Sequence, residues 1–164
     1  MTTLKGLDPM NSMAATGVGS VLSGRYVTSQ ISEDNEAPTV LIVALNSEVR
    51  DALAEILDGR GVNIECARGI EAASRLLAAG GVAACLCGFG LEDGSYKDLV
   101  KQAKRQVPEV PVIIVSTPSC PNEYREYLAA MNTGAFDFLC HPYQKREVER
   151  ILRLAVTSSR RTDR

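Results

Sequence analysis

The sequence predicts a doubly wound α/β fold: a five-stranded parallel sheet in the strand order 2-1-3-4-5, covered by helices on both faces. Two observations predict it. Between residues 39 and 158, five short apolar runs alternate with five segments of helical periodicity. The connections between them are short, so right-handed crossovers leave few topologies, and this order is the favoured one.

Composition narrows the class of protein. The chain has 164 residues, 45% apolar, with a formal net charge of −2, which is typical of one globular domain and gives no indication of a nucleic-acid or membrane surface. It contains no apolar stretch of the roughly 20 residues that a bilayer span needs, and no signal peptide is visible. Five cysteines, an odd number, indicate reduced thiols in the cytoplasm rather than a disulfide framework.

The chain divides at Pro38. Residues 1–37 are rich in Ser, Thr, Gly, Asn and Met and hold no period for long, so they are expected to form a flexible N-terminal tail. Residues 38–158 carry the regular pattern of the domain, and residues 159–164 are expected to be a short C-terminal tail.

The first half of the domain predicts two strands and two helices. Residues 39–45 are a continuous apolar run, typical of a strand buried on both faces. Asn46 and Ser47 are good helix caps, and the helix that follows ends at Gly59 and Gly61. Residues 62–67 alternate as a second strand, and residues 70–79 form a helix with Ala72, Leu76 and Leu77 inward.

The second half predicts three strands and three helices. Residues 82–87 form a buried strand, residues 88–94 a loop, and residues 95–106 a helix. Pro111 opens a fourth strand, Asn122 caps a helix over 123–132 that Gly134 ends, and residues 136–141 form the fifth strand. The last helix, 144–158, carries a core stripe of Val148, Ile151, Leu152, Ala155 and Val156.

Ligands of such sheets bind at the carboxyl ends of the strands. The residues at those ends are 44–46, 87–90, 116–120 and 140–143.

Four stretches of the chain resemble the receiver domain of bacterial response regulators, the phospho-accepting part of two-component systems. They are TVLIVALNSEVRDAL (39–53), LEDGSYKDLV (91–100), PVIIVST (111–117) and GAFDFLCHPY (134–143), of which the last is the most specific. The resemblance covers residues 38–158 and implies a flavodoxin-like receiver fold that acts in signal transduction, not as an enzyme.

The resemblance also implies a site that this sequence lacks. Receivers hold Mg²⁺ with two acidic residues after the first strand and the acceptor aspartate after the third; here those positions hold Ala44 and Leu45, followed by Asn46, and Gly88. Ser116 matches the family's hydroxyl. His141 replaces its lysine, and Phe138 stands at its aromatic switch position. Pro142 is present, and a cis His141–Pro142 bond is plausible. The chain resembles a degenerate pseudo-receiver with no metal and no cofactor.

Other residues offer weaker alternatives. Glu48, Glu92 and Asp93 lie near the site and are substitute phosphoryl acceptors only if they reach inward; otherwise they are solvated charges. Gly88, Gly90 and Gly94 resemble a phosphate-binding loop, but the third glycine comes one residue late, so a simple turn is favoured.

Cysteines gather at the same edge: Cys87, Cys120 and Cys140, beside His141. The spacing lacks the close cysteine pairs of a zinc site, so the interpretation is structural thiols, with a redox sensor as the alternative. His141 is either a solvated polar side chain or a pH-responsive cation. Arg160, Arg161 and Arg164 form a basic tip, which is more often solvated than bound to nucleic acid.

The expected function is signalling through a protein partner, such as a histidine kinase, an output protein or a second copy, without aspartate phosphorylation. The expected contact face is formed by the fourth helix, fifth strand and last helix, with residues Glu123, Arg125, Glu126, Phe138, Tyr143, Arg146 and Arg153. The alternatives are a thiol sensor using Cys87 and Cys140 and a flavodoxin-like binder of a small ligand.

Overall fold

The computed structural model describes residues 36–120 and 122–162, and Pro38 begins a compact unit. Residues 1–35 of the predicted N-terminal tail and residues 163–164 of the predicted C-terminal tail lie outside the described residues. In the described part of the chain, no helix is both long enough and apolar enough to cross a bilayer.

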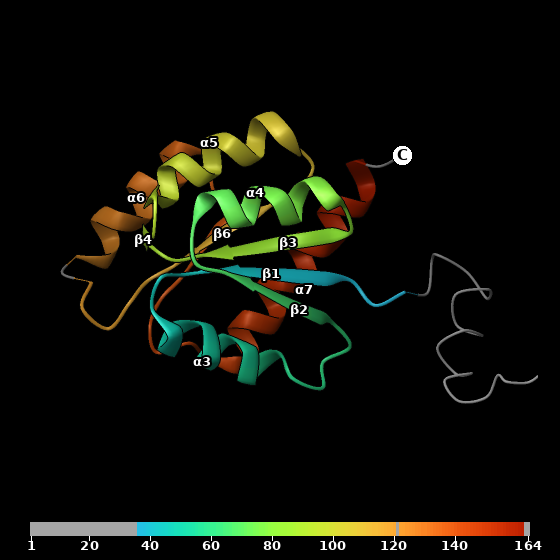
Figure 1. The fold of residues 1–164 in the computed structure, drawn as a ribbon. Helices are drawn as coiled ribbons and strands as arrows, with labels where there is room; N and C mark the ends of the chain where they lie inside the picture. The colour runs from blue at the N-terminus through green and yellow to red at the C-terminus, as the bar shows by residue number, and fades with distance from the viewer. Residues whose placement is uncertain (1–35, 121, 163–164) are drawn as a thin grey trace, which may run out of the picture. The chain divides into compact units, whose positions relative to one another are not determined.

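Five parallel strands form the sheet, in the order β2-β1-β3-β6-β7, which confirms the predicted topology (Figure 1). Their bounds are β1 Thr39–Val43, β2 Asn63–Ala67, β3 Val82–Cys87, β6 Val112–Val115 and β7 Asp137–Leu139. In the register, Val43 pairs with Ala67 on one side and Cys87 on the other, and Val115 pairs with Leu139. The carboxyl ends of the strands therefore meet at one edge of the sheet.

Helices cover both faces of the sheet and enclose two cores. Their bounds are α3 Ser47–Leu57, α4 Ile70–Ala79, α5 Tyr96–Gln106, α6 Glu123–Thr133 and α7 Lys145–Thr162. One core joins α4, α5 and α6 to the sheet, and the other joins α3 and α7 to the opposite face. Each helix buries its apolar stripe against the strands, and this burial is the main force that holds the layers together.

Local signals set most helix ends where the sequence predicts them. The Asn46 side chain accepts a hydrogen bond from the backbone N–H of Glu48 at 2.7 Å, and Asn122 accepts one from Arg125. Gly134 ends α6 in the left-handed region at φ 108°. The inward face of α4 is shifted slightly: Ala73 and Leu77 are buried, whereas Ala72 and Leu76 are half-buried.

The structure differs from the predicted boundaries at four places. β1 ends at Val43, two residues early, and β7 is only three residues long. The predicted loop 88–94 contains a small antiparallel pair, β4 Gly90–Leu91 and β5 Gly94–Ser95. Helix α7 runs to Thr162, so residues 159–162 are helical and not a tail, because nothing in SRRT breaks the helix.

Candidate functional site

The carboxyl edge of the sheet brings together four sequence positions that are far apart in the chain. Ala44 follows β1, Gly88 follows β3, Ser116 follows β6 and His141 follows β7. The backbone N–H of Gly88 donates to Val43 O at 2.9 Å, and that of Ser116 donates to Leu139 O at 2.8 Å. The predicted site residues after these strands thus share one edge.

The residues that follow β1 have structural roles or face solvent. Ala44 is 3% exposed and packs in the α3–α7 core, and the Asn46 side chain caps α3. Leu45 is 45% exposed. None of the three supplies a charged oxygen.

Gly88 lies directly beside Ala44. A Cβ atom built on Gly88 would lie 3.3 Å from the Cβ of Ala44, and its backbone needs no positive φ. A side chain at position 88 would therefore press on the methyl group of Ala44, whereas glycine does not.

A guanidinium group covers the end of β1. Arg50 Nη1 donates to Ala44 O at 2.6 Å and to Leu45 O at 3.0 Å. Nothing in the sequence indicates this contact, because an arginine inside a helix gives no signal of its partner six residues earlier.

A Mg²⁺ ion does not fit these residues. Mg²⁺ prefers carboxylate and water oxygens in an octahedral arrangement, and the positions beside the site carry methyl, hydrogen and isobutyl groups with a cation at the strand end. Among residues 36–120 and 122–162, no group of three or more His, Cys, Asp or Glu residues is placed to hold a metal ion.

Ser116 is the buried centre of a hydrogen-bond network. It is fully buried; its hydroxyl donates to Glu123 Oε2 at 3.0 Å and accepts from the backbone N–H of His141 at 2.7 Å. Its carbonyl accepts from the Tyr143 hydroxyl at 2.5 Å. This one side chain and its carbonyl join the start of α6 to the segment after β7.

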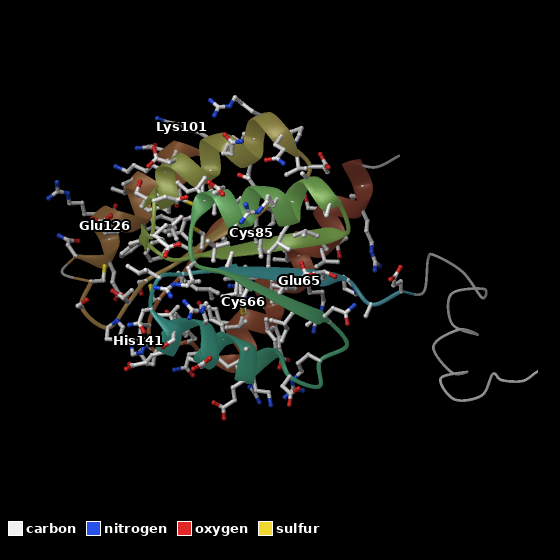
Figure 2. All side chains as sticks on the ribbon, in the orientation of Figure 1. Glu65, Cys66, Cys85, Lys101, Glu126 and His141 are labelled. Carbon is white, nitrogen blue, oxygen red and sulfur yellow. The ribbon has the colours of Figure 1, made fainter. Side chains whose placement is uncertain are left out.

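The segment after β7 contains the cis His141–Pro142 peptide bond that the sequence allowed. The His141 side chain is exposed, and Figure 2 shows it at the carboxyl edge of the sheet. Its ring lies against that of Tyr143, at a centroid distance of 5.3 Å. Burial raises the pKa of the Tyr143 phenol to about 12. The tyrosine therefore stays a protonated donor to Ser116.

The carboxylates of Asp93, Glu92 and Glu48, the alternative phosphoryl acceptors, make no hydrogen bond or ion pair with the residues of the site in the described part of the chain. The Asp93 carboxylate accepts from the backbone N–H groups of Ile70 at 2.6 Å and Glu71 at 3.0 Å, and so caps α4. These hydrogen bonds lower the pKa of Asp93. Glu92 is exposed, and Glu48 is exposed in the first turn of α3.

The cysteines lie in different environments. Cys85 and Cys87 are fully buried, which raises the pKa of Cys85 to about 12 and that of Cys87 well above its ordinary value. Cys140 is exposed, and partial desolvation, together with the nearby Glu123 carboxylate, raises the pKa of its thiol. Thiolates are the reactive form. Strand β6 lies between β3, which ends at Cys87, and β7, which precedes Cys140, so the arrangement disfavours the two as a redox pair.

The predicted partner face divides into exposed and internal residues. Arg125, Arg146 and Arg153 are exposed, and Glu126 is half-exposed. Phe138 is only 6% exposed and cannot contact a partner, because it packs against Phe89 and Tyr127 at ring-centroid distances of 6.0 and 6.1 Å. That expectation was wrong.

Two more of the predicted contact residues serve inside the domain. The Glu123 carboxylate accepts from the Ser116 hydroxyl, and the Tyr143 hydroxyl donates to the Ser116 carbonyl. The sequence analysis missed four large apolar side chains that are exposed on α6 and α7: Tyr124 (73%), Tyr127 (40%), Leu128 (44%) and Leu154 (52%). The i, i+4 spacing of Tyr124 and Leu128 was the available signal.

The chain was compared with known proteins by sequence and by structure. No family model matches the chain. The chain is 30% identical over 120 residues to the response regulator protein PilR of Pseudomonas aeruginosa, which covers 73% of this chain. The chain spans about a quarter (26%) of the length of PilR.

Solved structures share the fold. The signal receiver domain of an HD domain-containing protein from Pseudomonas fluorescens matches 78% of this chain and 93% of its own, with a TM-score of 0.69 and 20% identity. A CheY-like response regulator receiver domain from Methanospirillum hungatei matches 76% and 98%, with a TM-score of 0.65 and 18% identity. NtrX from Brucella abortus, in complex with ADP, matches 77% of this chain and 28% of its own, with a TM-score of 0.67 and 23% identity.

Proposed function

We propose that this domain signals in the cytoplasm by binding a protein partner and takes up no phosphoryl group. In its fold and its sequence match it is a receiver domain of the response-regulator type. The observation that carries the first half of the proposal is the exposed apolar surface on α6 and α7. The observation that carries the second is the replacement of the acidic pocket by Ala44, Leu45 and Gly88, with Arg50 at the end of β1.

The proposed docking surface consists of Tyr124, Tyr127, Leu128 and Leu154 with the charged side chains of Arg125, Glu126, Arg146 and Arg153. Strand β7 is at the edge of the sheet, and it contacts α6 on one face and α7 on the other. Aromatic and leucine side chains ringed by arginine and glutamate are the composition of a protein-binding surface.

Internal contacts connect this surface to the segments around it. The Ser116 network ties the start of α6 to the segment before α7, and Phe138 is packed under Tyr127. A rigid surface loses less entropy on binding than a mobile one. The proposal therefore needs no chemical signal to form the contact face.

The test begins with a photoreactive amino acid at Tyr124 of the full chain, produced in the source organism, to trap the partner. The trapped protein is then purified, and its affinity for the chain is measured with and without acetyl phosphate and Mg²⁺. We expect Leu128→Ala to weaken binding by about tenfold, as for an anchor residue.

Leu45→Ala is the matched control, because Leu45 is a leucine of nearly equal exposure, 45% against 44%, at a different place. It should leave the affinity unchanged. Equal loss in the two variants contradicts the assignment of the surface, and an affinity that rises with acetyl phosphate contradicts the phosphoryl-independent mode.

A further inference from the structure

Helix α3 presents an acidic stripe to solvent. Its exposed charged side chains are Glu48, Asp51 and Glu55, a spacing that keeps all three on the side opposite the buried Leu53 and Leu57. The exposed Asp58 follows directly after the helix as its C-cap residue. At 1.5 Å per residue, the helical part of the stripe, from Glu48 to Glu55, is about 10 Å long.

Helix α7 presents a basic stripe to solvent. Its members are Arg146, Arg150, Arg153, Arg160 and Arg161, all exposed, on the side opposite the buried Val148, Ile151, Leu152 and Ala155. This stripe is about 22 Å long by the same rise. The chain as a whole is nearly neutral, with a formal charge of −2, so the two stripes are a separation of charge and not a general excess.

The two helices are neighbours on one face of the sheet. Both pack on the same core, and Arg60, just after α3, pairs with Glu149 of α7 at 3.5 Å. Within residues 36–120 and 122–162, the ion pairs are Arg60–Glu149 and Arg75–Glu71. Neither pair includes a residue of the acidic or the basic stripe. The opposite charges of the stripes are thus not neutralised within the domain.

We infer that a second copy of this chain docks on the α3–α7 face, with α3 of each copy against α7 of the other. Both helices follow parallel strands and begin at the carboxyl edge, so they run in the same direction. A twofold axis parallel to the helices sets each acidic stripe against a basic one.

A twofold axis perpendicular to the helices is excluded by the same charges. It would set α3 against α3 and α7 against α7, where like charges repel. The charge pattern therefore selects one of the two symmetric pairings. The basic stripe shares Arg146 and Arg153 with the α6–β7–α7 docking surface, whereas α3 takes no part in that surface. The inference rests on the charge pattern of α3 and α7 and does not depend on the proposed function.

The first measurement is the mass of the full chain in solution by sedimentation at two salt concentrations. The Debye length falls from about 10 Å at 0.1 M to about 3 Å at 1 M salt, so an interface of exposed charges should dissociate at the higher value. We expect a dimer at about 0.1 M NaCl and a monomer at about 1 M. A monomer at both overturns the proposal.

The second measurement uses two charge-reversal variants. One carries Asp51→Lys and Glu55→Lys on α3, and the other carries Arg150→Glu and Arg160→Glu on α7. Each alone should raise the dimer dissociation constant at least about tenfold, because both halves of the symmetric interface become repulsive. Mixed in equal amounts, the two should restore a heterodimer, since each reversed stripe then faces its opposite.

The control reverses two exposed lysines on α5, on the other face of the sheet, with Lys97→Glu and Lys101→Glu. It should dimerise as the unchanged chain does. Thermal midpoints of all variants report folding. A mixture that stays monomeric, or a control that dissociates equally, overturns the proposal.

Discussion

Gly88 and Ala44 lie so close that a Cβ atom on Gly88 would be 3.3 Å from the Cβ of Ala44. In the family that the chain resembles, these positions carry the acceptor carboxylate and one of the acidic residues of the metal site. Here they form a contact between a hydrogen atom and a methyl group, with the Arg50 guanidinium on the neighbouring carbonyls.

The full chain should not react with acetyl phosphate and Mg²⁺. The expected mass spectrum lacks an adduct of about 80 Da, the mass of one phosphoryl group. The reason is that no carboxylate stands at Gly88, Ala44 or Leu45. An acid-labile adduct on Asp93 or Glu92 would contradict this.

Gly88→Asp alone should fold but gain no phosphorylation. One carboxylate does not replace the three that hold Mg²⁺ beside a donor. Acidic residues at Ala44 and Leu45 and a lysine at His141 should be required as well, with strongly non-additive effects. The measurement is the phosphorylation rate of the single and quadruple variants as Mg²⁺ is titrated; efficient reaction of the single variant would refute the degenerate pocket.

Of the two acidic residues needed after β1, only the one at position 44 should lower the stability of the domain. Ala44 is buried among apolar side chains, whereas Leu45 is half-exposed. Ala44→Asp should lower the free energy of unfolding by at least about 2 kcal/mol, because a buried carboxylate loses its hydration. Leu45→Asp should change it by less than about 0.5 kcal/mol, and chemical denaturation measures both.

Ser116→Ala should destabilise the domain by about 1–3 kcal/mol, since it leaves the N–H of His141 without its hydroxyl acceptor and removes the hydrogen bond that the Glu123 carboxylate accepts from Ser116. Ser119→Ala is the control, because that exposed hydroxyl contacts only Thr117 among the hydrogen bonds found. Equal stability of the two variants would show that the network does not hold α6.

Asp93→Asn should lower Tm at pH 7 by about 2–5 °C, through a weakened cap on α4. The pKa of Asp93 lies below its ordinary value of 3.8 in the folded state, so its contribution is present above that value and is lost as the pH falls through the lowered pKa. The difference between the variant and the unchanged chain should therefore shrink below about pH 4. Glu92→Gln, an exposed neighbour, should show no such difference.

Thiol labelling under native conditions should separate the cysteines by burial. Cys66 and Cys140 are exposed and should react first, whereas Cys85 and Cys87 should react only after unfolding. Rapid native labelling of Cys87, mapped by mass spectrometry, would reopen the thiol-sensor alternative.

The sequence by itself determined the strand order, the helix positions and the residues that stand where a phosphorylation site would be. It could do so because apolar periodicity, the Asn46 and Asn122 caps and Gly134 are local signals, each set within a few residues. The missing carboxylates at Ala44, Leu45 and Gly88 are likewise visible without coordinates.

Only the tertiary structure decided which side chains meet across the fold. Asp93 caps a helix that begins 23 residues earlier, and Ser116 joins two segments on either side of β7. Packing buried Phe138, which the sequence placed at the contact face, and exposed Tyr124 and Leu128 in its stead. The physical reason is that a residue's partners depend on how the layers pack, whereas the periodicity of a single element tells only which of its sides faces the core.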